Sequence, residues 1–145
     1  MALFASSKIL ILCTGNSCRS QMAEAFLKSF DNTLQVFSAG TEPANQINPF
    51  TIKVMAEVGI HIDNTIRPKH VNLFLNDAFD YLITVCDDAK ESCPVFYGQV
   101  TYRLHFGFED PANAKGNEED ILNSFRKVRD EIKTVFFKWY LEIKN

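Results

Sequence analysis

The sequence of 145 residues contains no long apolar run, no excess of basic residues and no segment of biased composition. The longest apolar run near its start, Ile9–Cys13, is far shorter than the ~18 residues of a membrane-spanning helix, so we expect no membrane contact. A net charge of −3 argues against a nucleic-acid-binding surface. Met1–Ser7 lacks a basic stretch and a cleavage site, so we expect no signal peptide and a cytoplasmic location.

The composition is that of one folded domain comprising residues 1–145. Hydrophobic residues make up 46% of the chain and charged residues 23%, which excludes wholesale disorder. A chain of this length can bury about 68–70% of its unfolded surface, so its core needs neither disulfides nor a metal. The 4 cysteines are therefore not required for stability. In a cytoplasmic protein we expect them to be reduced and chemically used rather than cross-linked.

Short apolar segments alternate with amphipathic segments along the chain. Strands are predicted at Lys8–Cys13, at Leu34–Ala39, at Tyr81–Val85 and over the alternating Val100, Tyr102 and Leu104. Helices are predicted for the apolar stripe from Met22 to Phe30, from Asn48-Pro49 to Gly59, and from a cap at Asn117 to Ile143. This order predicts an α/β fold: a three-layer sandwich in which helices flank a four-stranded parallel sheet. Its active site is expected at the carboxyl ends of the strands.

The most informative segment follows the first predicted strand, and it reads Cys13-Thr14-Gly15-Asn16-Ser17-Cys18-Arg19-Ser20. A cysteine that ends a buried strand, with an arginine six residues later at a helix start, can curl backbone N–H groups around a tetrahedral oxyanion. Gly15 permits the tight path, Arg19 can hold two oxygens with its planar guanidinium, and Asn16 can stabilise a left-handed turn. The alternative is a buried cysteine at a strand end with a surface arginine nearby.

Cys13 is the predicted nucleophile of this loop. The N–H donors and the helix dipole favour its thiolate, so we expect a lowered pKa, in the range of about 3.5–7.5 seen at comparable sites rather than ~8.5. Ser20 is placed to donate a hydrogen bond to that thiolate.

The stretch from Ile11 to Glu24 closely resembles the phosphate-binding loop of the low-molecular-weight phosphatase fold. Within that group it is most similar to the thioredoxin-coupled arsenate reductases, in which Ser-Gln-Met-Ala-Glu replaces the usual Ser-Pro of the phosphatases. Further matches span almost the whole chain, at Phe37–Gly40, at Val85-Cys86 through Cys93-Pro94, at His105–Pro111 and at Val128–Ile132. The resemblance implies a monomer that takes arsenate, with phosphate or sulfate as its mimic, and uses thioredoxin as reductant. It implies no metal and no organic cofactor.

A thiolate that attacks an oxyanion needs an acid to protonate the departing oxygen. Asp110-Pro111 is the matching position in this family. An Asp-Pro pair alone would be read as a turn. Together with the loop at Cys13, we interpret Asp110 as the acid.

Cys86 and Cys93 flank a charged segment, Asp87-Asp88-Ala89-Lys90-Glu91-Ser92. The residues alone leave a zinc site, a static disulfide or two unrelated buried cysteines open, although the spacing is wrong for zinc and the compartment disfavours a static disulfide. If the segment is helical, a rise of ~1.5 Å per residue puts the two Cα atoms about 10 Å apart. A disulfide needs roughly 4.4–6.8 Å, so the pair could bond only after the segment unwinds. The resemblance implies that it does so on oxidation and presents the disulfide to thioredoxin.

The resulting hypothesis is a relay of three cysteines. Residues 14–20 and Arg19 hold arsenate, Cys13 attacks arsenic, and Asp110 protonates the leaving hydroxyl. Cys86 then attacks Cys13 and arsenite departs. Cys93 resolves the bond to a Cys86–Cys93 disulfide, which thioredoxin reduces.

Two other functions compete with this hypothesis. A low-molecular-weight tyrosine phosphatase would use only Cys13, Arg19 and Asp110, but Ala112–Lys115 offers no aromatic wall for an aryl ring. An anion-binding or thiol-sensing module would signal through its cysteines without turnover. Cys18 fits that module best, through a reversible bond to Cys13; otherwise it is a spare thiol packed behind the loop.

Two minor features complete the comparison with the family. Asn16, Glu24 and Ser38 match positions that bind potassium in some related reductases. The further acid expected after the second helix is replaced by Arg67-Pro68, so the resemblance does not extend to the complete cation site. His105 is interpreted as a packed, hydrogen-bonded histidine rather than a catalyst.

Overall fold

The computed structural model of the chain describes residues 6–144. Residues 1–5, which include most of the segment examined for a signal peptide, and residue 145 lie outside the described part. No helix within residues 6–144 is both long and apolar enough to cross a membrane.

Four parallel strands form one sheet in the order β2-β1-β3-β4, which confirms the predicted fold. Their bounds are β1 Lys8–Cys13, β2 Gln35–Gly40, β3 Phe79–Thr84 and β4 Val100–His105. β1 is central and its residues Ile9–Leu12 have no exposed surface, as expected for an apolar run covered on both faces.

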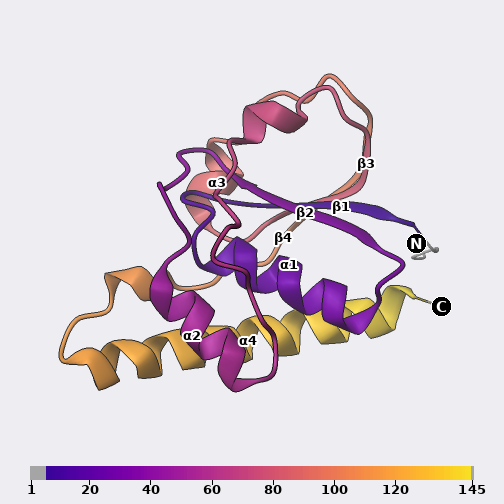
Figure 1. Ribbon diagram of the computed structural model, residues 1–145. Helices are drawn as coiled ribbons and strands as arrows, with labels where there is room; N and C mark the ends of the chain where they lie inside the picture. The colour runs from indigo at the N-terminus through magenta and orange to yellow at the C-terminus, as the bar shows by residue number, and fades with distance from the viewer. Residues whose placement is uncertain (1–5, 145) are drawn as a thin grey trace.

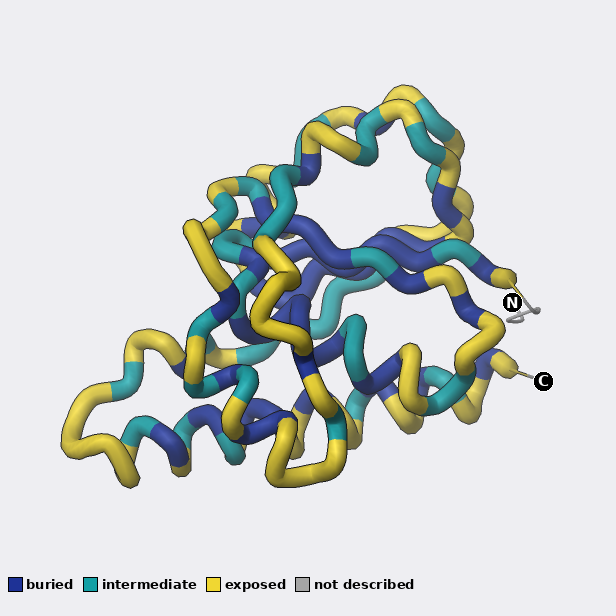
Figure 2. The backbone as a smooth tube through the Cα atoms, viewed as in Figure 1, coloured by how far each residue is buried: buried dark blue, intermediate teal, exposed yellow. Residues whose placement is uncertain are grey.

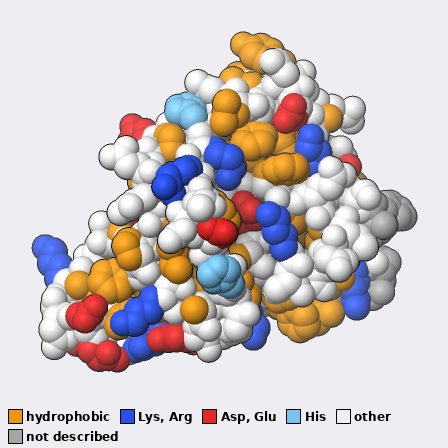
Figure 3. All heavy atoms as spheres, viewed as in Figure 1, with side chains coloured by type: hydrophobic (Ala, Val, Ile, Leu, Met, Phe, Trp, Pro, Cys, Tyr) orange, Lys and Arg blue, Asp and Glu red, His pale blue; other side chains and the backbone are white. Residues whose placement is uncertain are grey.

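Helices cover the sheet, with α1, α2 and α4 together on one side and the connections that contain η1 and α3 on the other (Figure 1). Their bounds are α1 Arg19–Phe30, α2 Pro49–Glu57, α3 Asp87–Glu91 and α4 Glu118–Ile143, with 3₁₀ turns η1 Val71–Phe74 and η2 Pro111–Asn113. Asn48 caps α2 and Asn117 caps α4, as predicted. Figure 2 shows the buried backbone concentrated in the sheet and on the helix sides that face it. Basic and acidic side chains are interspersed on the face drawn in Figure 3.

The edge strand β4 departs from the predicted half-buried alternation. Tyr102 is 40% exposed instead of buried. β4 is the edge strand of the described sheet, and the Tyr102 ring stacks on the buried Tyr81 with 5.3 Å between ring centroids.

The strand register brings four chain segments to one edge of the sheet. Cys13 pairs with Gly40, Leu12 with Thr84, and Thr84 with His105. The carboxyl ends of all four strands therefore meet where the loop after Cys13 begins, as the rule for open parallel sheets requires.

Candidate active site

The loop after β1 is held from outside by the chain that follows β2. Backbone N–H groups of residues 41, 42, 44 and 48 donate to the carbonyls of residues 13, 14, 15 and 17, at 2.9–3.2 Å. In a trans peptide the C=O and the next N–H point in opposite directions. Carbonyls turned outward therefore turn the N–H groups of residues 14, 15, 16 and 18 toward the centre of the loop. This inward set of donors is the arrangement that binds a tetrahedral oxyanion.

Gly40 lets this supporting segment approach. A Cβ at Gly40 would collide with the carbonyl oxygen of Thr14. The end of β2 can therefore pack directly against the loop only because the residue there has no side chain.

Cys13 is buried, with 2% of the residue exposed. Its sulfur is the atom that faces the loop. It lies 2.8 Å from Ser20 Oγ and accepts from the Asn16 N–H at 3.1 Å. Burial raises the pKa of the Cys13 thiol, while the hydrogen bonds of Ser20 and Asn16 and the charge of Arg19 lower it and offset only part of that rise. The prediction of a lowered pKa is therefore wrong for the free thiol. The sequence motif shows the hydrogen-bond donors, whereas the burial that raises the pKa depends on the rest of the fold.

Asn16 holds the loop in shape. Its φ of 53° lies in the left-handed region, as predicted. Its Nδ2 donates to Ser20 Oγ at 2.8 Å and to Ser38 Oγ at 2.9 Å. Its Oδ1 accepts from Gln21 Nε2 at 3.2 Å and from the Lys69 N–H at 2.9 Å. Every polar position of this fully buried amide is occupied, which fixes the path of the loop.

The residues that match a potassium site are hydrogen-bonded to one another. Ser38 donates to Glu24 at 2.6 Å, and the Lys28 ammonium lies 2.6 Å from the other oxygen of the same carboxylate. Asn16 turns its amide nitrogen, a donor, toward Ser38. These side chains therefore do not present a set of oxygen ligands for a cation.

Arg19, the first residue of α1, crosses to the loop that carries the predicted acid. One terminal nitrogen donates to the Phe108 carbonyl at 3.1 Å, and the other lies 3.5 Å from Asp110 Oδ2. Asp110 Oδ1 accepts from the Ala112 N–H at 3.0 Å, which orients the carboxylate. The buried Nε of Arg19 has no partner within residues 6–144 and is available to an anion.

Cys86 lies at the mouth of the loop. It caps α3, with its sulfur 3.4 Å from the Ala89 N–H, and the same sulfur is 3.4 Å from Thr14 Oγ1. A cavity of about 650 Å³ opens here, lined by Thr14, Arg19, Cys86, Asp87, Asp88, Gly107, Phe108, Glu109, Asp110 and Asn113. The structure thus gathers Arg19, Cys86 and Asp110 around one space next to the Cys13 loop.

Cys93 is not part of that space. It lines a separate cavity of about 200 Å³ together with Lys90 and Arg103. Burial raises the pKa of the Cys93 thiol, and Arg103 partly offsets the rise. All 4 cysteines are free thiols, and Cys18 is buried beside Ser17 Oγ at 3.6 Å.

The family model described as low molecular weight phosphotyrosine protein phosphatase matches residues 8–145. The chain belongs to this family. Within the curated proteins, it is 49% identical over 130 residues to an arsenate reductase of Shouchella clausii, covering 88% of this chain and 91% of that protein. It is 47% identical over 125 residues to an arsenate reductase of Bacillus subtilis, covering 86% and 88%. A solved structure described as an arsenate reductase in the phosphate binding state is 30% identical, with a TM-score of 0.77 and coverage of 94% and 98%.

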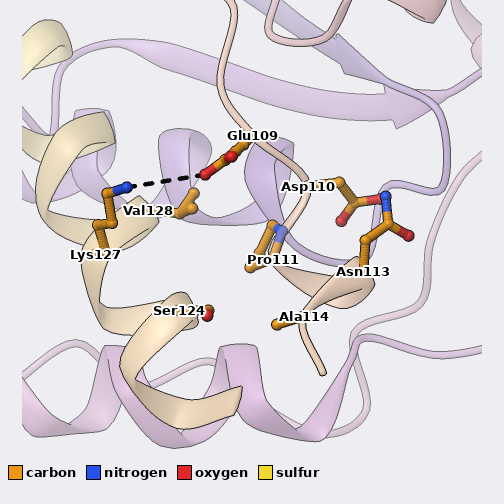
Figure 4. A pocket seen from close by; sticks show the side chains of 8 residues that line it. All are labelled: Glu109, Asp110, Pro111, Asn113, Ala114, Ser124, Lys127 and Val128. Carbon is orange, nitrogen blue, oxygen red and sulfur yellow. Dashed lines mark ion pairs between the residues drawn. The ribbon is translucent and has the colours of Figure 1, made fainter. Parts of the chain in front are cut away.

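A second cavity extends from Asp110 along α4 in this member of the phosphatase family. It measures about 330 Å³, and Figure 4 shows its lining side chains, with Lys127 paired to Glu109 at 3.9 Å. None of the 8 lining residues is aromatic. This second cavity therefore offers no ring to stack on an aryl group, whereas Phe108 lines the larger cavity with Asp110.

Several supporting residues were missed by the sequence analysis. The donors of residues 41–48, the Lys69 N–H and the Phe108 carbonyl act through the backbone, so their side chains give no signal. Gln21 is the exception. It belongs to the Ser-Gln-Met-Ala-Glu stretch and donates to both the carbonyl and the side chain of Asn16.

Proposed function

We propose that this chain reduces arsenate to arsenite through three thiols, Cys13, Cys86 and Cys93, and that thioredoxin regenerates it. The curated relatives described as arsenate reductases, at 47–49% identity over most of the chain, support the substrate. The loop of residues 14–20 is shaped for a tetrahedral oxyanion, which arsenate, phosphate and sulfate share.

The contact between Cys86 and Thr14 carries the proposal. The Cys86 sulfur lies 3.4 Å from the hydroxyl of the residue next to Cys13, and it lines the same cavity as Arg19 and Asp110. A phosphatase needs no second thiol at this point, whereas a reductase needs one within reach of the first. The Ala89 N–H also lies 3.4 Å from the Cys86 sulfur, so the cap of α3 holds this sulfur in place.

The first half of the reaction forms and breaks bonds at arsenic. The Cys13 thiolate attacks arsenic(V) and displaces a hydroxide. Asp110 protonates this hydroxide, which leaves as water. Arg19 and the inward N–H groups hold the remaining oxygens. The Cys86 thiolate then attacks the Cys13 sulfur. The S–As bond breaks with its electron pair on arsenic, which departs as arsenic(III), and a Cys13–Cys86 disulfide remains.

The second half restores the thiols. The Cys93 thiolate attacks the Cys86 sulfur and frees the Cys13 thiolate, leaving a Cys86–Cys93 disulfide. Since α3 separates the two residues, this step requires α3 to unwind. Thioredoxin reduces the disulfide by two thiol–disulfide exchanges. Sulfur carries both electrons, so the relay uses no metal or organic cofactor.

The test is arsenate-dependent NADPH oxidation with thioredoxin and thioredoxin reductase. The unaltered chain is expected to turn over, and Cys86→Ser and Cys93→Ser are expected to lose steady-state turnover. Ser92→Ala, an exposed change next to Cys93, is the matched control and is expected to keep it. Normal turnover by either cysteine variant would contradict the relay.

A phosphatase function is the second candidate, because Cys13, Arg19 and Asp110 suffice for a phosphoenzyme. Hydrolysis of p-nitrophenyl phosphate separates the two. We expect this hydrolysis to be slow, since none of the residues that line the cavity between Asp110 and α4 is aromatic. It should survive Cys86→Ser because a phosphoenzyme needs no second thiol. Fast hydrolysis without thioredoxin-coupled arsenate turnover would favour the phosphatase.

A further inference from the structure

His105 connects the sheet to the helix that carries the redox segment. It is the last residue of β4, and its Nδ1 lies 2.8 Å from the hydroxyl of Thr84, the last residue of β3. Its Nε2 lies 3.0 Å from Oδ1 of Asp87, the first residue of α3. A carboxylate can only accept, so Nε2 donates to Asp87, while Nδ1 bonds the Thr84 hydroxyl. Both ring nitrogens are thereby used.

The helix held by this contact is short. α3 has five residues, and Ala89 is its buried one. Helices this short do not form in water without tertiary contacts. Asp87 directly follows Cys86, so whatever holds Asp87 also holds the turn that aims the Cys86 sulfur at Thr14.

The surroundings leave room for the contact. A Cβ at Gly107 would lie 3.1 Å from His105 Nε2 and 3.7 Å from Asp87 Oδ1. A side chain there would press on the pair from the side of the active-site cavity, which Gly107 and Asp87 both line.

We propose that His105 is a positioning residue whose bond to Asp87 keeps α3 folded, with Cys86 beside the Cys13 loop, until Cys93 is needed. The inference rests on the proposed relay, because it concerns the pairing of Cys86 with Cys93. The bond belongs to the folded, reduced α3. Unwinding of α3 breaks it, so the bond opposes formation of the Cys86–Cys93 disulfide. A state is disfavoured by the free energy of the contacts that it must give up.

The experiment measures the thiol–disulfide equilibrium in the absence of arsenate. In a Cys13→Ser/Cys18→Ser background, only Cys86 and Cys93 remain. One thiolate attacks oxidised glutathione and releases one reduced glutathione; the other displaces the second and closes the protein disulfide. The fraction of disulfide at set ratios of reduced to oxidised glutathione, read by mass spectrometry, gives the equilibrium constant.

His105→Ala is expected to raise this constant about two- to fivefold, the effect of a net hydrogen bond to an exposed carboxylate. Asp87→Ala is expected to do the same, and the double variant no more than either one, because both remove one bond. His105→Gln keeps an N–H donor at a similar reach and is expected to restore most of the original constant. Asp88→Ala, which removes the neighbouring exposed acid of the first turn but no bond to His105 in the described structure, is the control and is expected to raise the constant less than Asp87→Ala, and by the same factor with or without His105.

The alternatives are separable. An unchanged or lowered constant in His105→Ala, or additive effects of the two single variants, overturns the inference while the relay stands. A merely structural role of His105 would not give an effect that depends on Asp87. Failure of Cys86 and Cys93 to form a disulfide in the background protein overturns the relay and the inference together.

Discussion

The Arg19 guanidinium lies 3.5 Å from the Asp110 carboxylate, and both groups line the cavity at the mouth of the Cys13 loop. In the proposed mechanism Arg19 binds the oxyanion, and Arg19 here also pairs with Asp110, the acid that would protonate the leaving oxygen. Asp110 is held by this pair on one oxygen and by the Ala112 N–H on the other. In the proposed mechanism, anion binding and acid catalysis are therefore coupled, and they should respond in opposite directions when the Asp110 charge is removed.

Asp110→Asn tests this coupling. The amide can still accept from Ala112 but no longer neutralises Arg19 or repels an anion. We expect phosphate to bind about threefold more tightly, as for loss of one partly exposed charge interaction. Arsenate turnover should fall at least ~100-fold because the leaving oxygen is no longer protonated. Titration calorimetry with phosphate and steady-state kinetics check the two effects, and weaker phosphate binding would contradict the coupling.

Ser20→Ala should shift the ionisation of Cys13. The Ser20 hydroxyl favours the Cys13 thiolate, so its removal leaves burial less opposed and raises the pKa of Cys13 further. Because only the thiolate reacts, the midpoint of the iodoacetamide alkylation rate should move to higher pH in Ser20→Ala. Mass spectrometry of the Cys13 peptide over a pH series measures the midpoint. A midpoint that stays or moves to lower pH would show that the hydroxyl does not stabilise the thiolate.

The sequence predicted the architecture and the left-handed turn of the loop, for physical reasons. The apolar run Lys8–Cys13 can only be a strand buried on both faces, and the caps at Asn48 and Asn117 mark helix starts by local hydrogen bonding. The left-handed turn at Asn16 is likewise a local preference of the residue type. Features of this kind are encoded by neighbours in the chain.

Features that depend on distant backbone or on burial could not be predicted. The Lys69 N–H reaches Asn16 from 53 residues away, and any residue except proline could supply that donor. The pKa of Cys13 was predicted in the wrong direction because the motif contains its donors, whereas its desolvation depends on the whole fold. The bond between His105 and Asp87 similarly arises only after β4 and α3 come together.

Replacing Asn16 should lower the free energy of unfolding, and two variants separate the roles of its side chain and its backbone. Asn16→Gly permits the φ of 53° but removes the bonds to Ser20, Ser38, Gln21 and Lys69, so we expect a loss of about 2–4 kcal/mol in the free energy of unfolding. Asn16→Ala removes the same bonds and also disfavours the left-handed backbone, which adds about 1 kcal/mol. Urea denaturation of both variants measures the difference. Equal stability of the two would mean that the turn relaxes once the amide is gone.

Glu57 should make stability depend on pH in the acid range. Its carboxylate accepts from Arg126 at 2.8 Å and from Arg129 at 2.9 Å, which joins α2 to α4. The hydrogen bond from Arg126, followed by that from Arg129, lowers the pKa of Glu57 from 4.5 to about 2. The unfolded chain therefore takes up the proton first as the pH falls. The stabilisation by Glu57 is complete above about pH 4.5 and is lost as the pH approaches 2.

Glu57→Gln removes this contribution and should be less stable than the unaltered chain at pH 7. The difference in the free energy of unfolding between the two proteins should narrow between about pH 4.5 and pH 2, because only the unaltered chain has the carboxylate to protonate. Glu119→Gln is the matched control, since Glu119 pairs with Arg126 alone and its side chain is 66% exposed. At every pH, Glu119→Gln should lower the free energy of unfolding less than Glu57→Gln does. Urea denaturation at pH 7, 4 and 3 measures all three proteins. A gap that stays constant down to pH 3 would show that Glu57 stabilises the contact between α2 and α4 by packing rather than by its charge.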